Sequence, residues 1–177
     1  MHEILLHSGS YFDFLFPELN EIKIEDIAHG LSMTCRFVGQ CNRFYSVAEH
    51  SVYVSHLVPE EHAMAALLHD SSEAFLGDVS KPLKNLLSEY MMIEESVERA
   101  IFKQYNIPFP LPTCVKEADT IMLVTEQHQV MDNVDEWVTT LGFKPADINI
   151  SCWSPDQAKT FFLDRYYELT LIEANHG

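Results

Sequence analysis

His69 and Asp70 are neighbours in the chain, and their side chains offer one imidazole nitrogen and one carboxylate oxygen. They lie in the segment A-A-L-L-H-D-S-S-E-A-F-L-G-D, residues 65–78, where a small apolar helix is expected to end. A second histidine, His50, lies upstream, and Asp119 lies downstream within helical sequence. The order H…HD…D predicts a metal centre that three separate helices bring together, as in the cores of helix bundles.

The donor set of this centre indicates which cation it suits. Two imidazoles with two carboxylates favour Mn, Fe, Co, Ni or Zn over Ca or Mg, because imidazole prefers transition metals. Four protein ligands leave positions open for water and a substrate oxygen. A cation held in this way screens phosphoryl oxygens and makes water nucleophilic at neutral pH, which the hydrolysis of a phosphate ester requires. Burying Asp70 and Asp119 without a cation would be costly.

Two further acidic residues in the same block are candidate catalytic groups. Glu73 comes four residues after His69, so one continuous helix would place both side chains on the same face. We expect Glu73 to orient or deprotonate the attacking water. Asp78 follows Gly77, where the helix should stop and the backbone can approach a ligand. Asp78 is expected to bind a second ion, such as Mg, or to donate a proton to the leaving oxygen.

Basic and aromatic residues on either side are candidate substrate contacts. Lys81 and Lys84 follow closely enough to meet further phosphates. Upstream, the planar fork of Arg36 can grip a phosphate, and the ring of Phe37 can stack on a base or sugar. The alternatives are a surface ion pair for Arg36, a core position for Phe37, and ordinary solvated charges for the lysines.

The remaining histidines and the cysteines do not form a competing motif. Four histidines are interpreted as structural side chains: His29, His56, His62 and His128. No two histidines are four residues apart, which excludes an H-E-x-x-H protease helix. Cys114 and Cys152 have no histidine nearby in sequence, so a nucleophilic cysteine is the weaker hypothesis. The chain also contains no G-x-S-x-G, P-loop or Rossmann fingerprint.

The composition of the chain limits which classes of partner it can bind and where in the cell it is expected. With 177 residues, 47% of them hydrophobic and 21% charged, the chain suits a single globular domain over residues 1–177. A net charge of −16 repels nucleic acids and anionic membranes, which leaves a small-molecule substrate. The sequence has no signal-peptide pattern and no membrane-length apolar run, so we expect a cytoplasmic protein. Four cysteines without C-x-x-C spacing predict reduced, mostly buried thiols.

The sequence pattern predicts that these residues are positioned by an all-α domain, with a possible short N-terminal β-hairpin within residues 2–16. Ser46 and Glu49 predict a capping box, as do Ser154 and Gln157. The expected helices run approximately over 26–33, 47–57, 60–75, a short stretch after Pro82, 89–105, a stretch from Thr113, and 155–173. Residues 132–153 are expected to be irregular, and residues 90–93 are a candidate subunit interface.

Several spaced motifs resemble the HD-domain phosphohydrolase superfamily. They are C-R-F-V-G-Q, F-Y-S-V-A-E-H-S and L-L-H-D-S-S-E-A-F-L-G-D-V-S-K-P-L-K, and the resemblance covers about residues 25–126. Within the superfamily the chain is most similar to small single-domain nucleotide hydrolases. One branch comprises bacterial 5′-deoxynucleotidases, which release phosphate from deoxynucleoside monophosphates. The other comprises phage and prophage enzymes, including dATP triphosphohydrolases.

The resemblance implies a helical HD-domain bundle and a role for each motif residue. It makes His50, His69, Asp70 and Asp119 the metal ligands and Glu73 the catalytic glutamate. Arg36 matches a phosphate-orienting arginine, and Phe37 stands where the 5′-deoxynucleotidases typically have tryptophan. The substrate loop corresponds to four residues: Gly77, Asp78, Val79 and Ser80. The family also implies homo-oligomers, either dimers or hexamers.

We therefore expect a divalent-metal-dependent phosphohydrolase acting on deoxynucleotides, with a deoxynucleoside triphosphate, dATP in particular, as substrate. The alternative enzyme is a 5′-deoxynucleotidase. A catalytically silent nucleotide-binding HD regulator and a metal-free helical scaffold are the alternatives from other classes.

Overall fold

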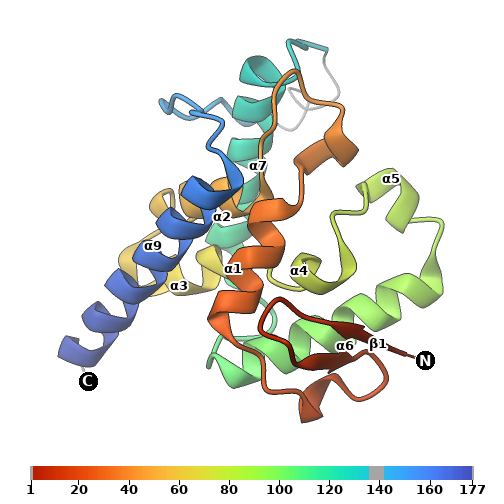
Figure 1. Cartoon of the computed structure of the whole chain (residues 1–177). Coiled ribbons are helices and arrows are strands. Elements are labelled where there is room, and N and C mark those ends of the chain that lie inside the picture. Colours follow the sequence, from red (N-terminus) through yellow and green to blue (C-terminus); the bar gives the residue numbers. More distant parts are fainter. Residues whose placement is uncertain (1, 136–141, 177) are drawn as a thin grey trace.

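A computed structural model describes residues 2–135 and 142–176 of the chain. Over these residues the regular structure is helical apart from a short hairpin, which confirms the predicted all-α class with an N-terminal β-hairpin (Figure 1). The strands and helices are β1 (Glu3–Leu5), β2 (Tyr11–Asp13), α1 (Ile24–Met33), α2 (Val47–His56), α3 (Ala63–Leu67), α4 (Glu73–Leu76), α5 (Lys81–Lys84), α6 (Ser88–Gln104), α7 (Thr113–Gln129) and α9 (Pro155–His176). Three 3₁₀ turns complete them: η1 (Pro17–Leu19), η2 (Arg36–Gly39) and η3 (Glu60–His62).

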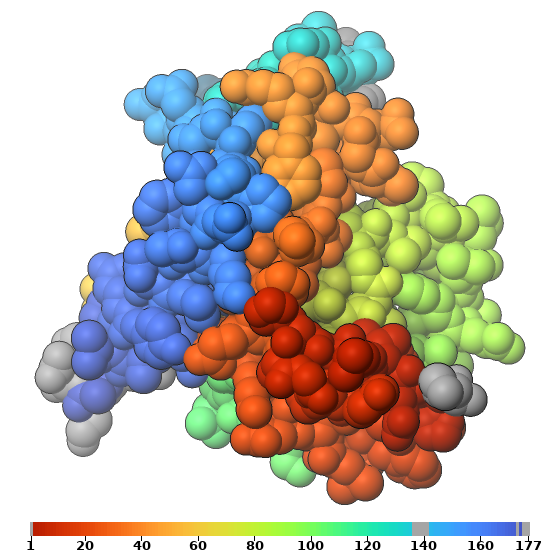
Figure 2. Space-filling model, in the orientation of Figure 1, coloured from red at the N-terminus to blue at the C-terminus, as the bar shows by residue number. Residues whose placement is uncertain are grey.

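The hairpin covers one side of the helical body rather than extending from it. Strands β1 and β2 pair antiparallel, with Ile4 opposite Phe12. Phe12 is fully buried, and its ring stacks on Phe75 of α4 with 4.3 Å between the ring centroids. In Figure 2 the hairpin (red) lies low on the same face that α9 (blue) flanks. Burial of Phe12 therefore ties the hairpin to the segment that carries Glu73.

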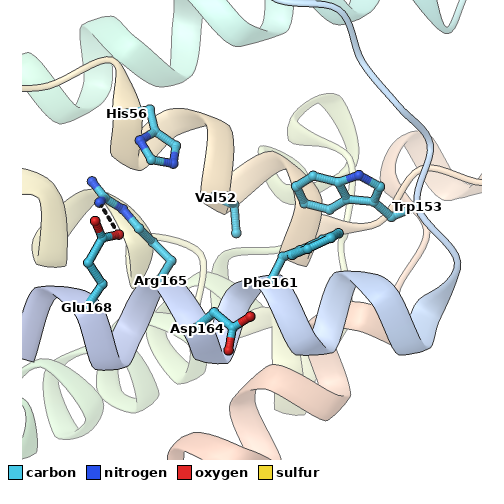
Figure 3. A pocket seen from close by; sticks show the side chains of 7 residues that line it. All are labelled: Val52, His56, Trp153, Phe161, Asp164, Arg165 and Glu168. Atoms are coloured by element: carbon cyan, nitrogen blue, oxygen red, sulfur yellow. Dashed lines mark hydrogen bonds and ion pairs between the residues drawn. The ribbon is translucent and has the colours of Figure 1, made fainter.

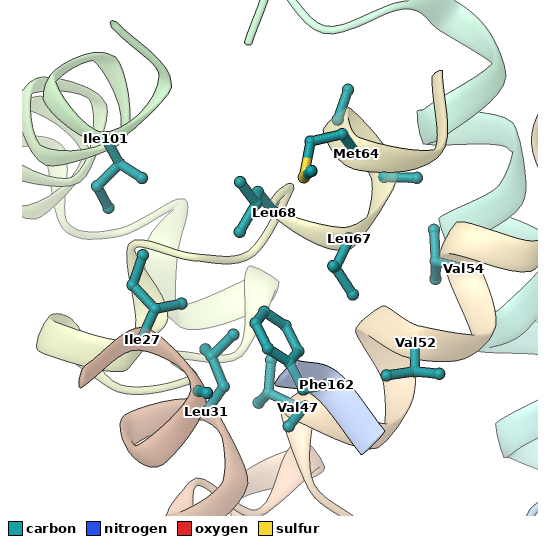
Figure 4. Packing of buried hydrophobic residues seen from close by; sticks show 14 of the residues in the cluster. Ile27, Leu31, Val47, Val52, Val54, Met64, Leu67, Leu68, Ile101 and Phe162 are labelled. Atoms are coloured by element: carbon teal, nitrogen blue, oxygen red, sulfur yellow. The ribbon is translucent and has the colours of Figure 1, made fainter. Parts of the chain in front are cut away.

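The apolar core lies where α1, α2, α3 and α9 meet. Ile27 and Leu31 of α1, Val47 of α2, Leu67 of α3 and Phe162 of α9 are fully buried and face one another (Figure 4). Burial of side chains of this size contributes about 1.5–3 kcal/mol each. The core thus fixes α2 and the α3 region relative to each other, and these two segments carry both predicted histidine ligands.

A glycine sets the distance between α1 and α4. A Cβ atom at Gly30 would lie 2.6 Å from the carbonyl oxygen of Ala74 and 2.9 Å from its Cα. No side chain larger than hydrogen fits without moving one backbone away from the other. Gly30 therefore lets α4, with Glu73 at its start, pack directly on α1.

The expected continuous helix over 60–75 is wrong. The chain forms η3 and α3, continues as turns at residues 68–72, and resumes as the helix α4. The Nδ1 of His69 lies 2.7 Å from the carbonyl oxygen of Ala66, the acceptor that an α-helix would offer to the amide of Asp70. Asp70, Ser71 and Ser72 follow, and such short polar residues favour turns over helix interiors. The helical-face argument for Glu73 fails for the same reason.

Smaller corrections concern caps and thiols. Helix α1 begins at Ile24 rather than at Asp26, whose Oδ1 instead accepts the amide of Ser8 at 2.9 Å. Ser46 caps α2 as predicted, by accepting the Glu49 amide at 3.1 Å. The Glu49 carboxylate does not reach back to Ser46; it accepts three backbone amides of residues 151–153. The four cysteines are half-buried rather than mostly buried.

The other expected boundaries agree closely with the structure. Ser154 and Gln157 form the predicted reciprocal capping box, and Gly77 ends α4 with a positive φ of 80°. The expected irregular stretch 132–153 holds over 132–135 and 142–153, while residues 136–141 lie outside the described residues. None of the described helices is long and apolar enough to cross a membrane.

Candidate metal centre

Three segments distant in sequence bring the four predicted ligands together. His50 lies one turn into α2, which Ser46 caps, and it is fully buried. His69 and Asp70 lie in the turn between α3 and α4, and Asp119 lies in the second turn of α7. The side chain of Asp119 remains 41% exposed. The imidazole of His50 therefore lies at the buried end of the site, and the carboxylate of Asp119 lies at the end that is open to solvent.

Three of the predicted ligands, His50, His69 and Asp119, offer ligand atoms that lie within 4.8 Å of one another. His50 Nε2 lies 3.3 Å from His69 Nε2 and 3.2 Å from Asp119 Oδ1. Asp70 Oδ2 lies 3.2 Å from His69 Nε2 and 3.6 Å from His50 Nε2. Two ligands at about 2.1 Å from one ion are about 3.0 Å apart at right angles and about 3.4 Å apart at tetrahedral angles. His69 Nε2 lies 3.9 Å from Asp119 Oδ1, which is longer than either value. His50, His69 and Asp119 form a group that could hold one metal ion, and Asp70 lies beside this group.

The outer nitrogens of both imidazoles have acceptors, which orient the inner nitrogens. His50 Nδ1 lies 2.6 Å from Glu126 Oε1, and His69 Nδ1 lies 2.7 Å from the Ala66 carbonyl oxygen. A hydrogen bond donated from Nδ1 leaves the Nε2 lone pair directed at the centre. The tautomer is inferred from these partners.

Charges inside the site shift the acidity of the ligands. Burial opposes ionisation of Asp70, yet the neighbouring His69, His50 and Arg36 hold its pKa well below the ordinary range. Burial by itself lowers the pKa of His69, but the charges of Asp70 and Asp119 raise it to about 9. The site therefore stabilises positive charge between its carboxylates.

Glu126 is a central residue that the sequence interpretation missed. It is fully buried on α7 and accepts the hydroxyl of Tyr45 at 2.9 Å, besides its contact with His50. Its other oxygen accepts Arg36 Nε at 3.2 Å and Nη2 at 2.9 Å. Burial opposes its ionisation, but Arg36 and His50 lower its pKa. The available signal was its position seven residues after Asp119, two turns along the same helix face.

Arg36 is not the surface ion pair that the alternative reading allowed. Its side chain is 10% exposed, and besides Glu126 it lies near Asp70, with 3.6 Å between Nη1 and Oδ2. It thus lies directly beside a predicted metal ligand. Phe37 is half-buried and packs against the core, and its ring centroid lies 5.3 Å from the Arg36 guanidinium carbon. The arginine is therefore held in place by Glu126, with its guanidinium group beside Asp70.

A cavity of about 500 Å³ adjoins the predicted centre. Its lining comprises His69, Asp70, Ser72, Glu73, Lys84, Met91, Glu94, Glu95, Glu98 and Phe109. Lys84 Nζ bridges two of these residues, at 3.3 Å from Glu73 Oε1 and 2.6 Å from Glu94 Oε1. The second oxygen of Glu73 is buried and has no hydrogen-bond partner among the described residues. Sequence reasoning found Glu73 and Lys84, but not the three glutamates that α6 contributes.

The remaining predicted substrate residues lie near this cavity without lining it. Residues 77–80 are half-buried, and Lys81 is exposed. Asp78 acts on the site through its charge. Burial, together with the charges of Asp70 and Asp78, raises the pKa of Glu73 well above its ordinary value. A direct substrate contact by residues 77–81 stays a prediction.

A second hollow, of about 450 Å³, lies between α2 and α9 (Figure 3). Trp153 and Phe161 form its aromatic end, and Arg165 pairs with Glu168 at 2.7 Å near His56. Its lining contains none of the four predicted ligands, so it is separate from the metal centre.

The chain is similar to two bacterial proteins. It is 38% identical over 172 residues to the uncharacterized protein YfdR of Escherichia coli, covering 96% of this chain and 97% of that protein. It is 36% identical over 137 residues, 70% of each chain, to the uncharacterized protein RCAP_rcc00048 of Rhodobacter capsulatus. No family model matches the chain. Because the first similarity spans nearly the full length of both proteins, the chain belongs to the same protein family as YfdR.

Proposed function

We propose that this protein is a divalent-metal-dependent phosphohydrolase of deoxynucleotides, with a deoxynucleoside triphosphate, dATP in particular, as substrate. One observation supports the proposal: the side chains of His50, His69, Asp70 and Asp119 lie together, and His69 and Asp70 line a cavity. A bound Co, Mn, Zn, Fe or Ni ion would polarise a phosphoryl oxygen and lower the pKa of a bound water.

The residues of the chain supply the proton transfer and the orientation. Glu73 lines the cavity and has one unpartnered oxygen, so it can accept a proton from an attacking water. Burial and the charges of Asp70 and Asp78 raise the pKa of Glu73 above its ordinary value, which makes its carboxylate a stronger base. Arg36, which lies beside Asp70, and Lys84, which lies beside Glu73, are assigned to the phosphate oxygens.

The charge of the cavity favours the alternative substrate. Its lining includes four glutamates, Glu73, Glu94, Glu95 and Glu98, together with Asp70, whereas the cationic side chains in the lining are Lys84 and His69. A triphosphate carries more negative charge than a monophosphate, so it would need a further cation at this surface. A 5′-deoxynucleotidase, which acts on monophosphates, is therefore the second candidate. For the triphosphate substrate, we propose that a second ion such as Mg near Asp78 supplies the further cation.

Product analysis separates these activities. The protein is incubated with Co²⁺ or Mn²⁺ and a panel of dNTPs and dNMPs. Triphosphate released from dATP supports the lead, and inorganic phosphate from dAMP alone supports the alternative. Asp70→Ala should abolish turnover, whereas Asp132→Ala, at an exposed residue that pairs with Asn42, should not.

Metal analysis tests the remaining classes. A purified protein that holds no transition metal and binds none would indicate a helical scaffold. A protein that binds both metal and nucleotide without turning it over would indicate a silent regulator.

Self-association is a separate part of the proposal. Met91, Met92 and Ile93 expose 41%, 72% and 42% of their surface on α6. We assign this strip to a homo-oligomer contact, in a dimer or a hexamer. Light scattering of the Met92→Glu variant tests it, because a buried charge would dissociate the assembly.

A further inference from the structure

Cys35 and Cys41 flank a tight turn, and their sulfur atoms are in contact. Cys35 Sγ is 3.6 Å from Cys41 Sγ, and the Cys41 thiol also lies 3.7 Å from the carbonyl oxygen of Arg36. Both residues are half-buried. The thiol pair Cys35–Cys41 is therefore packed in contact while remaining within reach of a small reagent.

The backbone between the two cysteines explains why they meet. Phe37, Val38 and Gly39 all have positive φ, at 57°, 56° and 75°. The left-handed conformation is unfavourable for Phe37 and especially for a β-branched residue such as Val38, and runs of it are rare. Here it turns the chain back on itself, so that the residues before and after the segment face each other.

Both ends of the segment are attached to the body of the protein. The Arg36 amide donates to the Tyr45 carbonyl oxygen at 2.9 Å, and Cys35 forms a β-bridge with Ser46. Beyond Cys41, the Asn42 amide donates to the Val130 carbonyl oxygen at 2.7 Å. These anchors hold the cysteines close in the reduced state. A disulfide requires the sulfurs to approach to about 2.05 Å, a small displacement for a surface segment.

We propose that Cys35 and Cys41 are a modification site at which a low-molecular-weight disulfide, such as oxidised glutathione, forms a reversible intramolecular disulfide across the Arg36–Gly39 turn. The thiolate of one cysteine attacks the reagent, forms a mixed disulfide and releases one glutathione thiolate. The thiolate of the second cysteine attacks the protein sulfur of that mixed disulfide and releases the second glutathione. In total two protein thiols are oxidised and one glutathione disulfide is reduced to two thiols.

The order of attack follows from the environment of the two thiols. Burial, together with the contact between its thiol and that of Cys35, raises the pKa of Cys41 to about 11. Cys41 therefore stays protonated at neutral pH and acts second, once Cys35 carries the mixed disulfide. Arg36 and Phe37 lie inside the closed loop, so oxidation would fix the segment beside the metal centre.

The arrangement of tryptic sites gives a direct test. Trypsin cleaves after Lys23, Arg36 and Arg43, so the two cysteines fall in separate peptides, 24–36 and 37–43. The full-length protein is treated with oxidised glutathione, its free thiols are alkylated, and it is digested without reduction. The expected product is one species made of both peptides minus two hydrogens, which dithiothreitol separates.

Variants distinguish this site from general thiol oxidation. Cys114→Ser should leave the cross-linked species unchanged, because Cys114 lies outside the pair. Cys41→Ser should abolish it and leave a glutathione adduct on Cys35. Two separately alkylated peptides, or a cross-link from Cys35 to Cys152, would overturn the proposal. None of these measurements depends on hydrolase activity. The result for the disulfide is therefore independent of whether the protein proves to be a phosphohydrolase.

Discussion

Glu126 lies 2.6 Å from Nδ1 of His50, and with its other oxygen it accepts two hydrogen bonds from Arg36. One buried carboxylate on α7 thus orients a predicted metal ligand on α2 and the cation assigned to the phosphate. The same helix supplies Asp119, a further predicted ligand. The orientation of His50 and the orientation of Arg36 are therefore coupled through a single residue.

Replacing Glu126 with glutamine should weaken metal binding. The amide is a weaker acceptor for His50 Nδ1–H and carries no charge to balance Arg36, so we expect a loss of about 10–100-fold in affinity. Titration with Co²⁺ in competition with a chelating dye measures it. Glu117→Gln, an exposed position on the same helix, is the matched control. Equal affinities in the two variants would contradict the coupling.

Metal binding should stabilise the fold. A ligand that binds only the native state stabilises it by about 2.7 kcal/mol at a free concentration 100 times Kd. We expect Co²⁺ to raise the midpoint of thermal unfolding of chelator-treated protein. His50→Ala should remove this increase, while His56→Ala, an exposed position on the same helix α2, should retain it. An identical increase in both variants would place the binding site elsewhere.

Replacing Gly30 with alanine should separate α1 from α4. The added Cβ would meet the backbone of Ala74 at 2.6 Å, a contact that side-chain rotation cannot relieve. Overpacking of this kind costs about 1–3 kcal/mol, which urea denaturation measures. Met33→Ala, on an exposed part of the same helix, should change stability by no more than about 0.5 kcal/mol. A Gly30→Ala variant as stable as the parent protein would show that the two helices can move apart freely.

Glu98 should make the stability of the metal-free protein depend on pH. Burial and the charges of Glu94 and Asp70 raise its pKa to about 7. A carboxyl group with a raised folded-state pKa favours its neutral form, so its effect on stability is most favourable at low pH. Stability is lost as the pH rises from the unfolded-state value near 4.5 through about 7.

The check is urea denaturation of the parent protein and Glu98→Gln at pH 5 and pH 8, with a chelator present. The stability of the variant relative to the parent should increase between the two pH values. Glu89→Gln, at an exposed position on the same helix α6, should show no such increase. A parallel response in the two variants would exclude Glu98 as the titrating group.

The sequence by itself determined which residue types make up the candidate site and where most helices begin and end. The His69–Asp70 pair and Glu73 could be identified from the sequence because they lie in one short block. The caps at Ser46 and Ser154 and the stop at Gly77 were readable because local hydrogen bonds and backbone conformation set them. Information of this kind depends on residues within about one helical turn of each other.

Only the tertiary structure decided which groups that are distant in sequence bind the same carboxylate, line the same cavity or bring their sulfur atoms into contact. Glu126 meets Arg36 across 90 positions of sequence, and the carboxylate of Glu49 binds amides about 100 positions away instead of completing its capping box. The helix expected through His69 was interrupted because its own side chain takes a backbone carbonyl. Long-range packing and competition for hydrogen-bond acceptors settle such features, and neither is encoded in the spacing of residues along the chain.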